Sequence, residues 1–211
     1  MSAQTVSYCI DPHTTAVVGV DFQIAFGSFE PVPGAERALE NFRRAASAWR
    51  AAGGQVIQVH MAYTPDRGPA GRMTDFAPEA AQMLSEGTEA TAFYDGIVEP
   101  KDILVRKNLF SAVMGSDLLE QLHARELDTV VIGGLTTPIC VQSTVDGLSM
   151  SGIKVVVLED ACASQPIGTL TARDAHVAAI QRMGYLFGQI LSTQEFLATV
   201  ADLTSANEAS V

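Results

Sequence analysis

The feature that most constrains how this chain can fold is the alternation of short apolar runs with amphipathic segments. Short runs rich in Val, Ile and Leu occur at residues 16–21, 55–60, 103–105, 129–132, 154–158 and 185–191. Runs of this length and composition favour strands that are buried on both faces. Segments with helical spacing lie between or after them, at residues 35–52, 117–125, 140–151, 170–183 and 193–203. The alternation predicts βαβ units and therefore an α/β fold, a three-layer α/β/α sandwich around a six-stranded, mostly parallel, Rossmann-like sheet.

No linker rich in Gly, Ser or Pro divides the 211 residues, so we expect a single domain over residues 1–211. Residues 1–14 are polar and irregular, and are expected to form an N-terminal arm on the body or on another subunit. Residues 61–102 are rich in Gly, Pro and Asp, with a short helix expected near 78–84. A loop of this length inside a compact domain is usually functional. The tail, residues 204–211, is expected to be frayed.

Charge and cysteine usage narrow the partners and the compartment. The chain has 13 basic and 24 acidic residues, a net charge of −11, which argues against nucleic acid and membrane as partners because both demand a basic face. No apolar run approaches the length of a transmembrane helix, and the N-terminus lacks the pattern of a secretory signal. Three widely spaced cysteines without a CxxC pair indicate reduced thiols and a cytoplasmic protein.

Reactive side chains follow three of the predicted strands. Asp21 follows the first strand, Lys107 the third and Cys140 the fourth. Ligands of an open parallel sheet bind beyond the carboxyl ends of its strands, so these groups are expected to converge there. A thiol needs a base or a nearby cation to become a thiolate at neutral pH. We expect Asp21 to accept the proton, and Lys107 and the N-terminus of the following helix to lower the thiol pKa.

Each of these residues also has a simpler interpretation. Asp21 is explained equally well as a turn-forming acid after a strand, and Lys107 as a solvated charge at the edge of the sheet. Cys140 is explained as a small buried apolar residue, as most free cysteines are. Each simple explanation is adequate for one residue. The three together are less satisfactory, because all three residues fall at the same end of the predicted sheet.

Four segments carry a pattern that goes beyond strand ends: VVGVDFQIAF (17–26), RKNLFSAVMGSDL (106–118), VVIGGLTTPICVQSTVDGLSMSGIKVVVLEDACAS (130–164) and RMGYLFGQILST (182–193). In this order and spacing they resemble the isochorismatase-like cysteine hydrolase family, over about residues 15–200. The block from Gly133 to Asp160 is the most specific part. The family fold is a six-stranded parallel sheet with helices on both faces, in agreement with the fold that the alternation predicts.

The resemblance implies a catalytic triad formed by Asp21, Lys107 and Cys140. It also implies a cis peptide bond between Leu135 and Thr136, before the nucleophile. By the same analogy the backbone N–H groups of Thr136 and Cys140 form an oxyanion hole, a preorganised pair of donors for the charge that develops in the transition state. Isochorismatases that cleave a vinyl ether lack the cysteine, so its presence favours acyl transfer over ether cleavage.

The resemblance also bears on metals. Nicotinamidases of this family bind a metal through an Asp-x-His motif and a further histidine just downstream. Here the second strand ends in His60, and the next histidine is His123, on the helix after the third strand. We therefore expect no metal site and no cofactor, with His60 at the rim of the substrate pocket. His123 and His176 lie on predicted helices and are expected to be surface or interface groups.

Residues that flank the triad in the sequence are expected to line a partly apolar substrate pocket: Phe22, Gln23, Phe26, His60, Phe110, Pro138 and Ile139. Arg67 and Arg72 lie in the long loop, where they are either solvated or clamp a substrate carboxylate. Cys9 and Cys162 have no charged partner in the sequence pattern and are expected to be structural.

The sequence therefore predicts a cysteine-dependent amidohydrolase. It would cleave the C–N bond of a small amide, carbamoyl or ureido substrate, other than a peptide, through a thioester intermediate. Two alternatives stay open: a hydrolase of another bond, ether or ester, and a non-catalytic α/β binding or assembly protein that retains the triad by descent. The resemblance further implies a homo-oligomer, a dimer or tetramer, and leaves the substrate and the pathway undefined.

Overall fold

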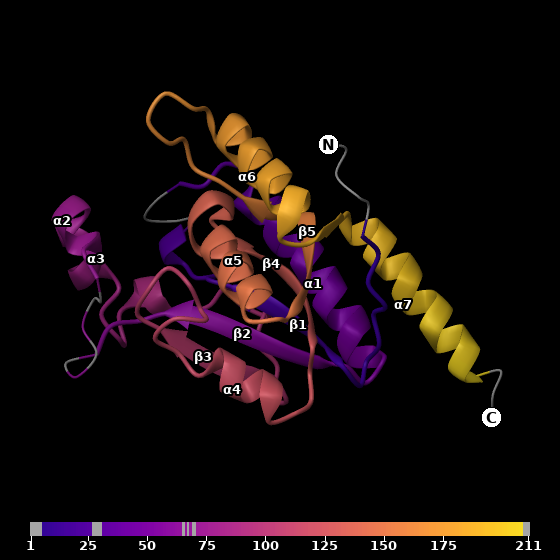
Figure 1. The fold of residues 1–211 in the computed structure, drawn as a ribbon. Helices are drawn as coiled ribbons and strands as arrows, with labels where there is room; N and C mark the ends of the chain where they lie inside the picture. The colour runs from indigo at the N-terminus through magenta and orange to yellow at the C-terminus, as the bar shows by residue number, and fades with distance from the viewer. Residues whose placement is uncertain (1–5, 27–30, 65, 67, 69–70, 209–211) are drawn as a thin grey trace.

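A computed structural model describes residues 6–26, 31–64, 66, 68 and 71–208. Its centre is a sheet of six parallel strands in the order β3-β2-β1-β4-β5-β6 (Figure 1). The strands are β1 Thr15–Val20, β2 Gln55–Met61, β3 Ile103–Lys107, β4 Thr129–Leu135, β5 Lys154–Ala163 and β6 Gln189–Leu191. The order reverses between β1 and β4, which is where open α/β sheets bind ligands. The predicted α/β fold is confirmed, and every strand pair is parallel.

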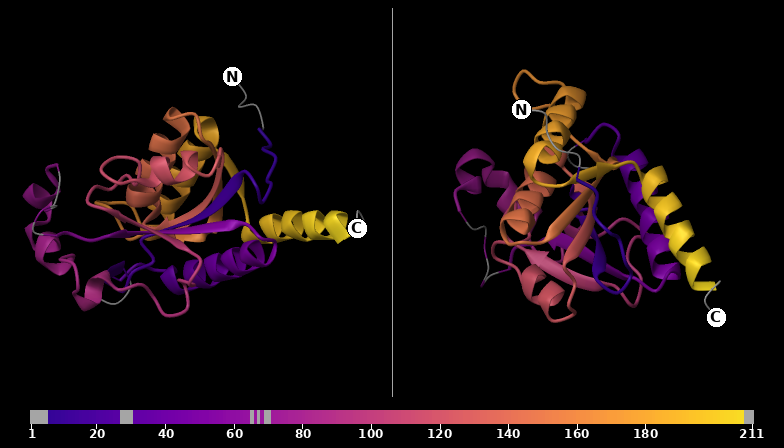
Figure 2. Two further views of the ribbon diagram at one scale, coloured as in Figure 1. Left: turned by 90° about the horizontal axis from the view of Figure 1, so that it is seen from below. Right: turned by 45° about the vertical axis from the view of Figure 1, so that its right-hand side comes forward.

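Helices cover both faces of this sheet (Figures 1 and 2). One face is covered by α1 (Ala35–Ala51) and α7 (Thr193–Glu208), and the other by α4 (Leu118–His123), α5 (Gln142–Met150) and α6 (Ala172–Leu186). Successive side chains of β1 alternate between the two apolar cores: Val17 contributes to the core under α1, and Val18 to the core under α5. This two-sided burial explains why the strands are apolar at nearly every position.

The predicted sixth strand, 185–191, is too long. Helix α6 continues to Leu186, and β6 spans only Gln189–Leu191. The helix expected over 170–183 would end before Gly184, but a Cβ atom at Gly184 would approach the Ile190 side chain to 2.8 Å. The glycine therefore allows α6 to lie close against β6 and does not end the helix. The end comes at Phe187 and Gly188, whose N–H groups both bond back to the carbonyl of Met183.

The N-terminal arm packs on the body, one of the two placements expected for it, whereas the tail is helical further than expected. The N-terminal arm lies on the body, with the Tyr8 N–H donating to Gln189 Oε1 at 2.8 Å and Ile10 buried. Helix α7 continues to Glu208, so the expectation of fraying from residue 204 is wrong that far. The hydroxyl groups of Thr204 and Ser205 donate to carbonyls one turn earlier, which suits a continuing helix. Residues 1–5 and 209–211 lie outside the described part.

The long segment 61–102 contains more structure than a plain loop. It holds α2 (Met73–Phe76), α3 (Pro78–Met83) and a 3₁₀ turn at Glu89–Thr91, and α3 confirms the short helix expected near 78–84. Helices α2 and α3 stand beside the carboxyl ends of β2 and β3 (Figure 1). Across the described ranges, no helix is long and apolar enough to cross a membrane.

Close contact between β4 and β1 depends on Gly134. A Cβ atom at this position would collide with the backbone carbonyl and the Cβ atom of Val20. On its other side, β4 shifts register against β5 between Ile132 and Gly134. Because Cys140 follows β4 and Asp21 follows β1, this contact sets how closely the two residues approach.

Replacing Gly134 with alanine tests this dependence. We expect Gly134→Ala to lower the free energy of unfolding by roughly 1–3 kcal/mol, because an added methyl group in a filled interior must displace the backbone. Chemical denaturation followed by fluorescence of Trp49, the single and fully buried tryptophan, measures the change. Gly68→Ala is the control, since a Cβ atom there meets nothing within 4 Å. Equal stability of both variants would contradict the close contact.

Candidate active site

Asp21 is placed by a sharp turn immediately after β1. Its backbone adopts φ 53°, a left-handed conformation that aspartate tolerates better than most residues. The Asp21 N–H still donates to the carbonyl of Val59 in β2 at 2.9 Å, so the residue remains attached to the sheet. Its side chain is fully buried and pairs with Lys107. Asp21 is therefore more than a solvent-facing turn acid.

Lys107 is the last residue of β3, two strands away from β1. Its Nζ lies 2.8 Å from Asp21 Oδ2, with both side chains inaccessible to solvent. The same Nζ donates to the backbone carbonyls of Leu109 at 3.2 Å and Phe110 at 2.9 Å. These partners hold the ammonium group in one position. The alternative of a solvated lysine at the edge of the sheet is wrong.

Cys140 completes the cluster from the third direction. It lies in a π-helical turn, Thr137–Val141, that joins β4 to α5, and α5 begins at Gln142 rather than at the expected residue 140. The thiol is buried, and both Asp21 and Lys107 lie close enough to shift its pKa. The structure therefore brings together all three residues that the sequence pointed to.

The electrostatics of the thiol differ from our expectation. Burial raises the pKa of the Cys140 thiol well above its usual value; the positive charge of Lys107 lowers this pKa, and the negative charge of Asp21 raises it. Lys107 acts to lower the pKa of the thiol, as expected, but desolvation outweighs it and the net shift is upward. For Lys107, burial acts to lower the pKa, but attraction to Asp21 and Cys140 outweighs it and the pKa is raised. The resting cluster is thus a neutral thiol beside a buried ion pair.

Apart from the ion pair with Lys107, no described residue supplies the Asp21 carboxylate with a hydrogen-bond donor. Neither of its oxygens accepts a well-aligned hydrogen bond from any residue in the described ranges. A buried carboxylate in this situation can accept a proton from a thiol or a water molecule, because no other donor occupies its lone pairs. Asp21 is accordingly suited to act as a general base.

The backbone before Cys140 contains the cis peptide bond that the resemblance implied. The peptide bond between Leu135 and Thr136 is cis. The Thr136 carbonyl accepts the N–H groups of Ile139 at 3.2 Å and Val141 at 3.3 Å. In contrast, no described carbonyl of a turn or loop accepts the N–H of Thr136 or of Cys140.

Thr144 holds this turn from the side of α5, and sequence reasoning missed it. Its buried hydroxyl donates to the Cys140 carbonyl at 2.7 Å and accepts the Ala112 N–H at 3.0 Å. A threonine four residues after the cysteine was the available signal, since side chains at this spacing can reach back one helical turn.

Two of the residues expected to line the pocket have structural roles instead. The Phe22 ring is fully buried in the core under α1, 4.8 Å from the ring of Phe42. The Gln23 amide is engaged by backbone: its Nε2 donates to the carbonyls of Met61 and Thr91, and its Oε1 accepts the Met61 N–H. Gln23 therefore fastens the turn after β1 to the end of β2.

The other expected pocket residues keep part of their surface accessible. Three of them are half-buried: Phe26, Pro138 and Ile139. Phe110 is exposed, and its own backbone carbonyl accepts a hydrogen bond from Lys107. They remain candidates for lining a substrate site.

His60 is half-buried at the end of β2, where its ring meets the edge of Phe93 at 5.1 Å between centroids. Burial lowers its pKa, so the ring is neutral at pH 7. It lines a polar cavity of about 700 Å³ along the β3 edge of the sheet, together with Arg106 and Glu86. Within the described ranges, no three His, Cys, Asp or Glu side chains cluster in a way that could hold a metal ion.

Tyr63 is a further residue near the cluster that the sequence did not single out. It is buried two residues after β2, and its hydroxyl contacts the sulfur atoms of Met61 and Met73, each at 3.3 Å. Burial raises the pKa of Tyr63, and the charges of Cys140 and Asp21 raise it further. The phenol is therefore a neutral group within electrostatic reach of the cluster.

The remaining candidates lie elsewhere or were misjudged. His176 was expected at the surface but is half-buried, with its Nδ1 2.9 Å from Thr137 Oγ1. Arg72 is exposed and pairs with Asp75, and Arg67 lies outside the described residues. Cys162 is buried in β5 and Cys9 is exposed. Burial raises the pKa of Cys162 to about 12.

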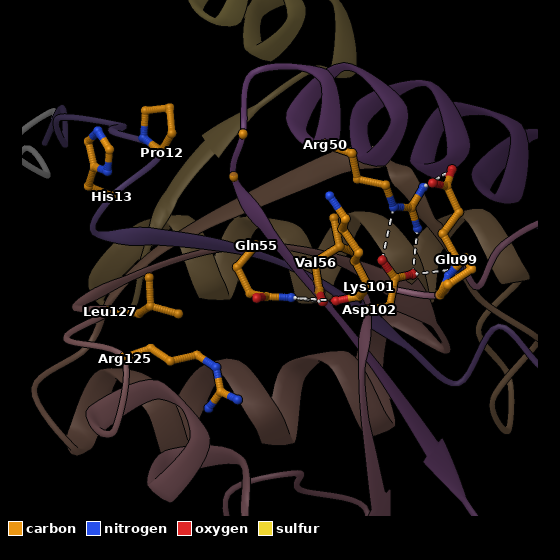
Figure 3. A pocket seen from close by; sticks show the side chains of 13 residues that line it. Pro12, His13, Arg50, Gln55, Val56, Glu99, Lys101, Asp102, Arg125 and Leu127 are labelled. Carbon is orange, nitrogen blue, oxygen red and sulfur yellow. Dashed lines mark hydrogen bonds and ion pairs between the residues drawn. The ribbon is translucent and has the colours of Figure 1, made fainter.

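A second cavity, of about 730 Å³, lies at the opposite, amino-terminal edge of the sheet (Figure 3). Three of its charged residues pair with one another: Arg50 makes a bidentate contact with Asp102, at 2.6 and 2.9 Å, and a further contact with Glu99 at 3.1 Å. These three residues therefore act as structural ion pairs.

The fold and the carboxyl edge together define a class of protein, a doubly wound α/β fold with a buried Asp–Lys–Cys cluster at the point where strand order reverses. The family model described as the Isochorismatase domain matches residues 15–195. The chain belongs to the isochorismatase family, as the resemblance implied.

Individual relatives agree with this assignment. The chain is 28% identical over 189 residues to YecD, an isochorismatase family protein of Escherichia coli O157:H7, covering 89% of this chain and 97% of that one. It is 29% identical over 216 residues to the ureidoacrylate amidohydrolase RutB of Rhizobium rhizogenes, covering 91% and 85% respectively. A solved cysteine hydrolase from Pseudomonas syringae pv. phaseolicola has a TM-score of 0.88 and 26% identity, covering 96% of this chain and 100% of that one.

The charges around the thiol predict opposite effects for two substitutions. Asp21→Asn removes a nearby negative charge and should lower the apparent pKa of Cys140, whereas Lys107→Met removes a positive charge and should raise it. The pH dependence of Cys140 alkylation by iodoacetamide, in a Cys9→Ser background, measures both. The unsubstituted thiol should titrate above the ordinary value of about 8.5. Shifts of the same sign in the two variants would contradict this account of the cluster.

Proposed function

We propose that this protein is a cysteine-dependent amidohydrolase that cleaves a C–N bond, other than a peptide bond, in a small amide, carbamoyl or ureido compound. The observation that carries the proposal is the burial of the Cys140 thiol within electrostatic reach of the ion pair of Asp21 and Lys107. A neutral thiol needs a base within hydrogen-bond reach, and Asp21 is that base. The name of the relative RutB, an ureidoacrylate amidohydrolase, supports the class of bond.

Acylation of the enzyme is the first half of the reaction. Asp21 takes the thiol proton as the Cys140 sulfur attacks the carbonyl carbon, and Lys107 stabilises the thiolate as it forms. The negative charge on the former carbonyl oxygen is bound by the backbone N–H groups of Thr136 and Cys140. The intermediate then collapses, the C–N bond breaks, and protonated Asp21 donates its proton to the leaving nitrogen. The products of this half are a thioester on Cys140 and an amine or ammonia.

Hydrolysis of the thioester returns the resting cluster. Asp21 accepts a proton from a water molecule as the oxygen of the water attacks the thioester carbonyl. The second tetrahedral intermediate occupies the same oxyanion site. Its collapse breaks the C–S bond, and Asp21 returns the proton to sulfur while the acid leaves. Atoms and protons balance without a metal or redox cofactor, and the residues of this chain supply every proton transfer.

A panel of small compounds tests the proposal. We expect ammonia or amine release from one or more simple amides, carbamoyl or ureido compounds, and none of comparable rate from a vinyl ether. Cys140→Ala should lower this activity by more than about a thousandfold, because it removes the nucleophile. Cys162→Ala is the matched control, since it removes a second buried thiol outside the cluster.

The outcomes separate the alternatives. Activity on an ether or ester alone would favour a hydrolase of another bond. Amide cleavage that survives in Cys140→Ala would overturn the covalent mechanism. An inert Cys140 thiol and no activity on the whole panel would favour a binding or assembly protein.

A separate measurement addresses metals. We expect protein purified without added metal to contain no stoichiometric zinc by elemental analysis, and chelators to leave amide cleavage unchanged. The physical reason is that one histidine, His60, offers too few ligands for a zinc site, which needs three or four. Stoichiometric zinc that is lost in a His60→Ala variant would show that this expectation is wrong.

A further inference from the structure

The turn that carries Cys140 is connected by a side-chain hydrogen bond to a helix outside the cluster. Thr137, fully buried in this turn, places its Oγ1 2.9 Å from Nδ1 of His176. His176 lies in the second turn of α6, which begins at Ala172 and packs against the π-helical turn. In the sequence, Thr137 directly follows Thr136 and precedes Cys140 by three residues.

The protonation state of His176 is compatible with a stable hydrogen bond to Thr137. Burial lowers the pKa of His176, and the charge of Arg37 lowers it further, so the ring is neutral at pH 7. A neutral imidazole has one N–H donor and one acceptor nitrogen, and a hydroxyl can both donate and accept. In either tautomer the ring nitrogen and the Thr137 hydroxyl therefore make one hydrogen bond.

Side chains from two helices hold the turn in addition to its backbone hydrogen bonds. In a π-helical turn the backbone hydrogen bonds span five residues instead of the four of an α-helix. Such turns occur as short insertions, frequently at functional sites. The Thr136 carbonyl binds Ile139 and Val141 within the turn, and Thr144 holds the Cys140 carbonyl from α5. The His176 contact holds the other end of the turn, beside Thr136, from α6.

We propose that His176 is a positioning residue, which acts through Thr137 to hold the backbone N–H groups of Thr136 and Cys140 in place for the oxyanion. The inference rests on the proposed function and deepens it. Loss of the contact should impair reactions that pass through a tetrahedral oxyanion and should spare the intrinsic reactivity of the thiol. A purely structural role would affect both or neither.

Two reagents separate these properties at the same sulfur atom. Acylation of Cys140 by p-nitrophenyl acetate passes through a tetrahedral oxyanion, whereas alkylation by iodoacetamide displaces iodide and forms none. Thr137→Val removes the hydroxyl at nearly constant shape, and His176→Phe removes the ring nitrogens and keeps a ring. We expect each variant to slow acylation roughly 10- to 100-fold, the cost of a small misplacement of preorganised groups. Alkylation and the thermal midpoint should stay close to those of the unsubstituted protein.

A double-mutant cycle tests whether the two residues act as one unit. If they do, the Thr137→Val/His176→Phe double variant should acylate about as slowly as either single variant. Thr137→Ser and His176→Asn, which each retain a group capable of the hydrogen bond, should recover most of the rate. His123→Phe, at an exposed position on α4, is the control and should acylate normally.

The results separate this inference from the proposed function. Normal acylation in Thr137→Val and His176→Phe, or equal slowing of acylation and alkylation, would overturn the positioning role. Independent, multiplicative effects in the double variant would do the same. If His176→Phe does not fold, Thr137→Val and Thr137→Ser carry the test alone. Failure of the reagent to acylate Cys140 in the unsubstituted protein, with no amide cleavage, would instead overturn the proposed function.

Discussion

The site depends on one interaction, the ion pair of Asp21 and Lys107 in the interior of the protein. Removing two charges from water is costly, and attraction compensates only when the geometry is good and the remaining protons find partners. Here the 2.8 Å contact and the two backbone carbonyls that receive Nζ meet that condition. The pair also constrains the sheet, because Asp21 follows β1 and Lys107 ends β3, with β2 between them. The register that sets Met61 beside Lys107 therefore supports the chemistry as well as the fold.

Burial of the ion pair also sets the state of the thiol. The same exclusion of water that strengthens the ion pair disfavours a thiolate at Cys140, so its pKa is raised although a lysine is adjacent. A nucleophile of this kind forms when the proton has a base to go to and the new charge has donors to bind it. The free lone pairs of Asp21 and the backbone N–H groups near Thr136 fit these two requirements. In the proposed mechanism, the raised pKa of the thiol favours proton transfer coupled to attack over a preformed thiolate.

The turns of Cys140 and Asp21, at the carboxyl edge of the sheet, are held by side chains from different parts of the chain. The turn of Cys140 is held by Thr144 from α5 and contacted by His176 from α6, on one face of the sheet. The turn that follows β1 and contains Asp21 is held by Gln23. The side-chain amide of Gln23 hydrogen-bonds with the end of β2 and with the segment before β3. Gln23 and His176 are two of the residues whose surroundings the sequence misjudged. Each hydrogen-bonds with a residue distant in the sequence, Thr91 or Thr137, and a local sequence pattern carries no information on such pairs.

What the sequence by itself determined is the architecture and the identity of the reactive residues. Apolar runs and helical spacing encode local preference and burial, so they predict six parallel strands, two layers of helices, and the strand ends at which Asp21, Lys107 and Cys140 stand. Tertiary structure alone decided the rest. Gly184 permits a close helix–strand contact, an outcome that the glycine itself does not specify. The direction of the Cys140 pKa shift follows from a balance between desolvation and two opposite charges. That balance depends on distances and on the exclusion of water, which exist only once β1, β3 and β4 are assembled side by side.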